Sequence, residues 1–201
     1  MKSAISATAR RRLRQAVAQR GITLVEACVV MTIAVVLGSA AAPSLRDMVE
    51  MRRFERAATE LVSDLQFVRT ESVARNQPLR LSRYATTGGS CYVVHSGDAA
   101  QCHCSQPGPA QCSGDAQELR TVRLPADDRV SLTGTAHSVL FDPLHGTVSP
   151  TATLRVIGLS SGLSSGPGSG ARAREVHHVI NVMGRVRSCS PLGAIAGYRA
   201  C

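Results

Sequence analysis

The apolar run from Ile22 to Ala42 constrains this chain more than any other feature of its sequence. The run contains no Lys or Arg and one carboxylate, Glu26. At about 1.5 Å per residue, a helix of this length spans roughly 31 Å, which matches the hydrocarbon core of a bilayer. A carboxylate within a bilayer costs on the order of 3 kcal/mol unless it has a partner. The run therefore predicts a membrane helix in which Glu26 has a specific task.

The residues before this run form a basic leader. Six of the 23 Lys and Arg residues precede Ile22, and no acid does. Because positive flanks stay on the cytoplasmic side, this arrangement predicts a cytoplasmic N-terminus and an exported remainder. Much of the formal net charge of +9 thus belongs to the leader and does not by itself indicate a nucleic-acid surface.

Three explanations compete for this N-terminal segment. A secretory signal peptide would be cut after the small residues before Pro43, where proline hinders cleavage. A plain membrane anchor leaves the acid unexplained. Cleavage after Gly21 would instead create an α-amino group at Ile22, which could pair with Glu26 of a neighbouring subunit. The third explanation is favoured because only this one gives the buried carboxylate a cationic partner.

The stretch Gly21-Ile22-Thr23-Leu24-Val25-Glu26 resembles the class III signal of type IV pilins and type II secretion pseudopilins. These proteins have Gly at −1, an apolar residue at +1 and Glu at +5. The resemblance implies cleavage by prepilin peptidase between Gly21 and Ile22 and N-methylation of Ile22. It also implies that Glu26 guides assembly from the inner membrane into a helical filament.

The periodicity of the remaining chain predicts an α+β fold. Apolar residues recur at steps of three and four from Met51 to Ser72, while Glu60 and Asp64 fall on the other helical faces. Pro78 ends this helix, because it disfavours helical geometry in the residue before it. Alternation with a period of two then predicts strands at 79–84, 129–133, 138–142 and 151–158, and residues 175–187 predict a closing strand or a hairpin arm.

One helix followed by several short strands indicates an antiparallel arrangement in either one sheet or two. With no Trp, three Phe and three Tyr, the core is expected to consist of Val, Leu, Ile and Ala. The expected organisation is a leader at 1–21, the transmembrane half of the helix at 22–42, its amphipathic continuation at 43–77 and a periplasmic β-rich domain at 78–201.

The segments VLFDPLHGTV, LRVIGL and REVHHVINVMGRVRSC resemble the C-terminal half of the GspH/FimT family of minor pseudopilins. That family has a strand with Phe-x-Pro-x-x-Gly, a following strand, and a final strand ending in Gly-Arg-x-Arg. The resemblance implies a pilin-like fold and a structural tip subunit of a type II secretion pseudopilus or type IV pilus, with no enzymatic activity and no cofactor. Implied partners are other major and minor pilins, prepilin peptidase and the inner-membrane assembly platform.

The motif at Gly184–Arg187 raises a second function. In an extended segment Arg185 and Arg187 point to one side, roughly 6.6 Å apart, and Arg199 is a candidate to join them. In the FimT branch the motif is implicated in DNA uptake. The alternative is a strand end with solvated arginines. Scarce aromatic residues argue against base stacking, so DNA binding here would be led by phosphates and sensitive to salt.

Six cysteines follow the apolar run, and their even number in an exported region predicts disulfides. They are Cys91, Cys102, Cys104, Cys112, Cys189 and Cys201. Six cysteines allow 15 pairings, and only a bond between Cys189 and Cys201 is specifically favoured, because it would hold the C-terminal loop. Zinc is disfavoured, because Cys-x-Cys lacks the usual ligand spacing, and no metal is expected. Residues 97–117 and 158–172 are expected to be loops.

Overall fold

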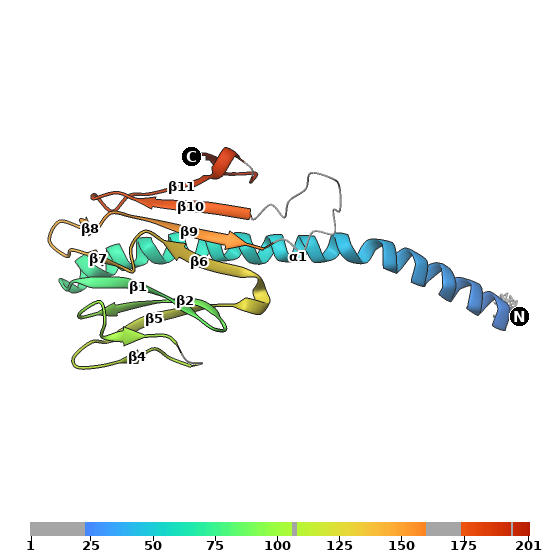
Figure 1. The fold of residues 1–201 in the computed structure, drawn as a ribbon, viewed down its shortest axis with the longest axis horizontal. Helices are drawn as coiled ribbons and strands as arrows, with labels where there is room; N and C mark the ends of the chain where they lie inside the picture. Colours follow the sequence, from blue (N-terminus) through green and yellow to red (C-terminus); the bar gives the residue numbers. More distant parts are fainter. Residues whose placement is uncertain (1–22, 106–107, 160–173, 194) are drawn as a thin grey trace, which may run out of the picture. The chain divides into compact units, whose positions relative to one another are not determined.

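The structure, a computed structural model, describes residues 23–105, 108–159, 174–193 and 195–201 (Figure 1). Two compact units divide the chain, Met1–Ala41 and Ala42–Cys201, and each is considered by itself. Helix α1, Leu24–Arg75, contributes to both units and ends three residues before Pro78, as the sequence predicts.

The described part of the first unit is the beginning of α1. Its large apolar side chains are exposed, among them Val25 at 71% and Leu37 at 65%. No single helix in the described residues is long and apolar enough to cross a membrane, whereas the segments Leu24–Ser39 and Ser44–Arg75, separated by a bend, satisfy length and composition only when taken together.

The described residues of the second unit form two five-stranded sheets and a two-stranded ribbon. The first sheet has the order β5-β2-β1-β7-β8, and its strands are β1 (Leu79–Thr86), β2 (Gly89–Ser96), β5 (Glu118–Pro125), β7 (Ser138–Phe141) and β8 (Val148–Ser149). The second has the order β12-β11-β10-β9-β6, with β6 (Val130–Gly134), β9 (Ala152–Gly158), β10 (Arg174–Ile180), β11 (Val186–Ser190) and β12 (Arg199–Ala200). The ribbon pairs β3 (Cys102–His103) with β4 (Gln111–Cys112), and two short 3₁₀ helices are η1 (Ala126–Asp128) and η2 (Pro191–Gly193).

The core lies between α1 and the inner faces of both sheets. Phe54, Leu61, Leu65 and Val68 of α1 are at most 1% exposed and recur at helical spacing. The expectation of a purely aliphatic core was wrong, because Phe54, Tyr92 and Phe141 are among the largest fully buried side chains. Each aromatic ring buries a large apolar area, so a few of them suffice for a small core.

Side chains join the two sheets where no strand ladder connects them. The backbone amide of Leu132 in β6 donates a hydrogen bond of 2.8 Å to Ser90 Oγ in β2. Arg83 of β1 donates to the carbonyl oxygens of Gly134 at 2.7 Å and Ala136 at 2.8 Å. These bonds satisfy backbone groups at the edge strand β6, which would otherwise be open to pairing with another chain.

The cysteine-rich segment 97–117 is not a simple interruption between strands. Its described residues form the β3–β4 ribbon, and two disulfides, Cys91–Cys104 and Cys102–Cys112, hold them. Cys91, Val93, Cys102 and Cys104 make a second buried cluster, so the ribbon covers part of the outer face of the first sheet. Since β2 is therefore buried on both faces, its sequence does not alternate.

The C-terminal strands form a hairpin. β10 pairs with β11 in antiparallel register, with Val179 opposite Arg187. Of the two forms the sequence allowed for 175–187, the structure has the hairpin, and Gly184-Arg-x-Arg stands at the beginning of β11 rather than at the end of a final strand.

Candidate functional site

Gly146, the glycine of the Phe-x-Pro-x-x-Gly motif, and Gly184, the glycine of the Gly-Arg-x-Arg motif, both lie against Arg69 of α1. Gly146 and Gly184 both adopt left-handed backbone conformations, with φ of +58° and +70°. A Cβ atom on Gly184 would lie 3.0 Å from Arg69 Nε and 3.0 Å from the carbonyl oxygen of Gly146. Only glycine fits this approach without strain. The glycine of Gly-Arg-x-Arg is thus a packing residue that fixes the β10–β11 turn against the helix.

Local hydrogen bonds fix the turn between β7 and β8 and the turn between β10 and β11. Asp142 Oδ2 accepts hydrogen bonds from the His145 backbone amide at 3.1 Å and from the His145 ring at 2.9 Å. The side-chain bond from His145 holds the pKa of Asp142 below its usual value. In the other turn, Asn181 Oδ1 accepts a bond of 2.9 Å from the Arg185 backbone amide. Arg185 therefore enters β11 from a defined position.

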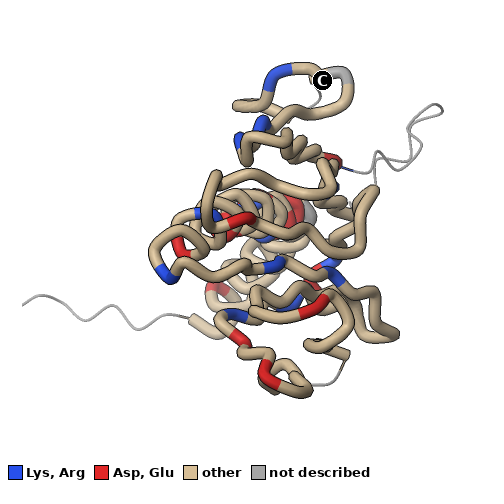
Figure 2. Tube along the Cα trace, turned by 90° about the vertical axis from the view of Figure 1, so that its left-hand side faces the viewer, with Lys and Arg blue, Asp and Glu red and all other residues tan. Residues whose placement is uncertain are grey.

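All three candidate arginines are exposed, and Arg187 and Arg199 belong to strands of the second sheet, whereas Arg185 immediately precedes β11. Arg185 and Arg187 are exposed, while Val186 between them packs toward the core. Arg199 is also exposed and is paired with Cys189 through the parallel β11–β12 register. Within the described residues, no acidic side chain pairs with any of the three. Figure 2 shows positively charged positions near the C-terminus.

The acid nearest in register to this arginine surface is already engaged. Glu175 Oε1 lies 2.7 Å from His177 Nε2 and 3.9 Å from a nitrogen of Arg155. His178, which follows His177 in β10, points to the opposite face of the sheet and is completely buried. Burial lowers the pKa of His178 to about 4, and its Nδ1 lies 2.9 Å from Ser188 Oγ. As expected for a strand, the two histidines occupy opposite faces.

The favoured disulfide between Cys189 and Cys201 is present. The Cys201 backbone amide also donates to the Ser190 carbonyl at 3.2 Å, and Ile195 in the enclosed loop is only 4% exposed. The bond therefore holds β12 beside β11 and Arg199 beside Cys189.

The cysteines considered for zinc are all bonded to one another. Cys91, Cys102, Cys104 and Cys112 form the two disulfides of the ribbon, so their sulfur atoms are not available as thiolate ligands. Across the described ranges, no group of three His, Cys, Asp or Glu residues is arranged to hold a metal ion.

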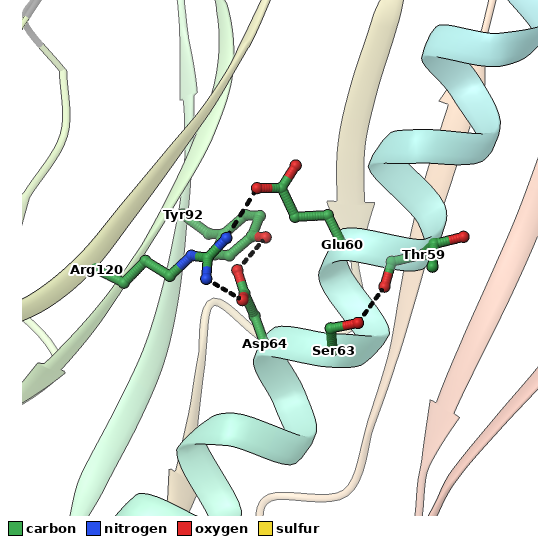
Figure 3. Close-up of polar contacts among 6 residues, drawn as sticks. All are labelled: Thr59, Glu60, Ser63, Asp64, Tyr92 and Arg120. Carbon is green, nitrogen blue, oxygen red and sulfur yellow. Dashed lines mark hydrogen bonds and ion pairs between the residues drawn. The ribbon is translucent and has the colours of Figure 1, made fainter.

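A buried polar cluster that the sequence did not reveal fastens α1 to the first sheet (Figure 3). Asp64 is 1% exposed, although its position in the helical pattern predicted an outward face. It accepts a hydrogen bond of 2.7 Å from the Tyr92 hydroxyl, and its other oxygen lies 3.1 Å from Arg120, which also contacts Glu60 at 2.9 Å. Burial raises the pKa of Asp64, and the bond from Tyr92 and the charge of Arg120 oppose this. Both carboxylate oxygens of Asp64 are engaged by partners within the fold, which indicates a structural role for the cluster.

The assembly candidate Glu26 lies in the first turn of α1. Its backbone amide donates to Thr23 Oγ1 at 3.2 Å, and its side chain is exposed. No described residue contacts its carboxylate. The processing candidates Gly21 and Ile22 lie outside the described residues.

The model of the family described as type II transport protein GspH matches residues 57–184, which is most of the chain. The chain belongs to the GspH family. A GspH-family protein is a pilin-like structural subunit of the cell envelope rather than an enzyme, and it interacts with other pilin-like subunits in a pseudopilus or pilus. The match ends at Gly184, so Arg185, Arg187 and Arg199 lie beyond it.

Among solved structures, the chain is similar to two crystal forms of the type IV minor pilin FimU from Pseudomonas aeruginosa. The form in space group P21 has 16% identity and a TM-score of 0.46, over 72% of this chain and 96% of that one. The form in space group P65 has 16% identity and a TM-score of 0.41, over 68% and 96%. No curated protein matches this GspH-family chain.

Proposed function

We propose that this GspH-family chain is a minor pseudopilin at the tip of a type II secretion pseudopilus or type IV pilus. Prepilin peptidase cuts between Gly21 and Ile22, and Ile22 is then N-methylated. The helix from 22 to 42 holds the subunit in the inner membrane before assembly, and the domain from 78 to 201 lies in the periplasm.

The observation that carries this proposal is the position of Glu26. It stands in the first turn of a helix whose following apolar side chains are exposed, and no described residue neutralises it. In an apolar environment such a carboxylate requires a cation. The new amino group at Ile22 of a neighbouring subunit would supply the cation when two helices pack with a fixed stagger.

Mass spectrometry of the mature protein tests the processing step. The proposal expects N-methylated Ile22 as the first residue. A first residue at Pro43 would identify a secretory signal peptide, and an intact Met1 would identify a plain anchor, so either result would contradict the proposal. A Gly21→Val variant provides the matched control, because it should block cleavage and leave the leader attached.

DNA binding is a second candidate function, favoured by arginines at and beside β11 and β12 that have no acidic partner among the described residues. Arg185, Arg187 and Arg199 are exposed, and Glu175, an acid of β10, is engaged by His177. Such a surface suits phosphates, which bind without sequence preference and release counterions.

Duplex DNA binding at two salt concentrations tests this candidate. The native chain should lose affinity steeply with salt, and the Arg185→Gln/Arg187→Gln variant should lower the slope by about 2. Arg56→Gln is the control, because Arg56 is also exposed but lies on α1. Equal binding by the native chain and the double variant would exclude a role for these two arginines.

A further inference from the structure

The described strands of the second sheet carry an excess of positive charge. Four arginines and one acid lie in β6, β9, β10, β11 and β12, and the acid is Glu175. The arginines are Arg155, Arg174, Arg187 and Arg199. Because an excess of one sign on a surface attracts a partner of the opposite sign, the position of this single acid decides how much of the positive charge is open to a partner.

Strand register places Arg155 in a row that also contains His177 and Arg199. Arg155 of β9 is paired with His177 of β10, and His177 is paired with Cys189 of β11. Cys189 is in turn paired with Arg199 of β12. Partners in a ladder share one face of a sheet, and this face is the outer one, because the neighbouring His178 is buried on the opposite side. Neighbouring strands are about 4.8 Å apart, so the row spans about 14 Å.

Arg187 belongs to the same face. It stands two positions before Cys189 in β11, and alternate residues of a strand share a face. Within the described residues, neither Arg187 nor Arg199 has an acidic partner. We call Arg155, Arg187 and Arg199 the outer arginine row. Since one DNA strand carries a phosphate for about every 3.4 Å of helix axis, a surface of about 14 Å spans roughly four nucleotides.

Arg155 differs from the other two arginines because a carboxylate stands beside it. Its Nη1 lies 3.9 Å from Glu175 Oε1, which is too long for a hydrogen bond, and its Nε has no hydrogen-bond partner among the described residues. The same oxygen of Glu175 lies 2.7 Å from His177 Nε2. Glu175 is therefore held by His177 and only screens the charge of Arg155. The Arg155 side chain is 43% exposed, so a phosphate oxygen can reach its guanidinium.

We propose that one strand of duplex DNA lies across the outer arginine row, that Arg155 binds a phosphate of this strand, and that Glu175 weakens the binding by screening Arg155. The inference rests on DNA binding as the second candidate function, and it adds a phosphate-binding residue and an opposing carboxylate outside the Gly184–Arg187 motif. The row favours DNA over a lipid surface, because its arginines stand at fixed spacings that suit a polymer of phosphates, whereas lipid headgroups impose no spacing.

Binding of a labelled DNA duplex to the full-length chain in detergent, measured by fluorescence anisotropy over a range of salt concentrations, tests the role of Arg155. We expect Arg155→Gln to lower the slope of log affinity against log salt by about 1, because one phosphate contact is lost. Arg155→Lys keeps the charge and should retain the native slope, as should the α1 control Arg56→Gln. A native slope for Arg155→Gln would overturn the inference.

Removal of the carboxylate tests the role of Glu175. Glu175→Gln should raise the affinity for the duplex about fivefold, which is the upper end of what an exposed ion pair contributes, and the Arg155→Gln/Glu175→Gln double variant should show no gain. Glu55→Gln is the matched control, because Glu55 also pairs with an arginine, Arg52 at 3.2 Å, but lies on α1. An equal gain from Glu55→Gln, or a gain that survives in the double variant, would reduce the effect to net charge and overturn the inference.

Competition against the labelled duplex separates a row of phosphate contacts from a site for single phosphates. Inorganic phosphate and glycerol phosphate, a soluble lipid headgroup, should require at least about a hundredfold more phosphate than unlabelled duplex does, because only the duplex makes several contacts at once. Equal competition per phosphate would overturn the inference. If Arg185→Gln/Arg187→Gln lowers the salt slope but Arg155→Gln does not, only this inference fails. If the native chain binds no duplex, the second candidate function fails and the inference falls with it.

Discussion

The two sheets of the second unit use similar lengths of chain in different ways. The first sheet is covered on its inner face by α1 and in part on its outer face by the disulfide-bonded ribbon. The second sheet is covered on its inner face, while its outer face exposes Arg187 and Arg199. A covered sheet face supports the fold, whereas an open charged face is available to partners. The second sheet is therefore where binding should be sought.

Disulfide removal should give the largest difference between the two sheets. The Cys91–Cys104 and Cys189–Cys201 bonds close loops of similar length, with sequence separations of 13 and 12. Their chain-entropy contributions should therefore be equal, about 3 kcal/mol each. Cys91 and Cys104 are 1% exposed, so breaking their bond also loosens buried contacts.

We expect Cys91→Ala/Cys104→Ala to lower the free energy of unfolding by about 5 kcal/mol and Cys189→Ala/Cys201→Ala by about 3 kcal/mol. Urea unfolding of the full chain in detergent measures both. Equal losses would show that the ribbon does not seal the first sheet.

The two histidines of β10, His177 and His178, lie on opposite faces of the second sheet. The pH dependence of stability should therefore differ between variants at the two positions. Burial lowers the pKa of His178 to about 4 in the folded chain, against 6.5 for a solvent-exposed histidine. The unfolded chain therefore binds this proton first, and stability is lost as pH falls from 6.5 towards 4, by roughly 3 kcal/mol in total. Above pH 6.5 this group makes no difference.

His178→Gln should remove most of that loss, whereas His177→Gln should retain it because His177 lies on the outer face. Thermal unfolding followed by circular dichroism at several pH values measures the difference. The same acid sensitivity in both variants would place its origin elsewhere.

Substitutions at two neighbouring positions before β11, Gly184 and Arg185, should have different effects on stability, because Gly184 is packed against α1 and Arg185 is exposed. Gly184→Ala should destabilise the chain by about 2 kcal/mol, because the new Cβ meets Arg69 and Gly146 in a left-handed backbone conformation. Arg185→Ala should change stability by no more than about 0.5 kcal/mol. Chemical denaturation measures both, and a larger effect at Arg185 would reverse the roles assigned here.

The same contrast between the sheets explains which features could be read from the sequence. Strands β1, β6, β7 and β9 were predicted, because one buried face produces alternation. β2 was missed because burial on both faces removes the alternation. β5 was also missed, because Arg120 and Arg123 interrupt its apolar pattern. Their partners, Asp64 and the Cys104 carbonyl oxygen, come near only in the folded chain.

The candidate site was predicted to the extent that it depends on local spacing. Local spacing favoured the Cys189–Cys201 bond that the structure contains, whereas the expectation that Arg185 and Arg187 share one face of a strand stays a prediction, since β11 begins at Val186. Local spacing could not place Asp64, because a helical pattern does not show that Tyr92 and Arg120 approach from the sheet. The contact of Gly146 and Gly184 with Arg69 could not be predicted for the same reason, since the two glycines are 38 positions apart in the sequence.

The central claim is that Glu26 is tolerated in an apolar helix because a neighbouring subunit's new N-terminus neutralises it. Quantifying the incorporation of Glu26→Gln into filaments, with Thr32→Ala in the same helix as control, tests this claim most directly. We predict that the Gln variant is still cleaved at Gly21 but enters filaments about tenfold less than the native chain or the control. Native incorporation of a correctly cleaved Glu26→Gln chain would contradict the account.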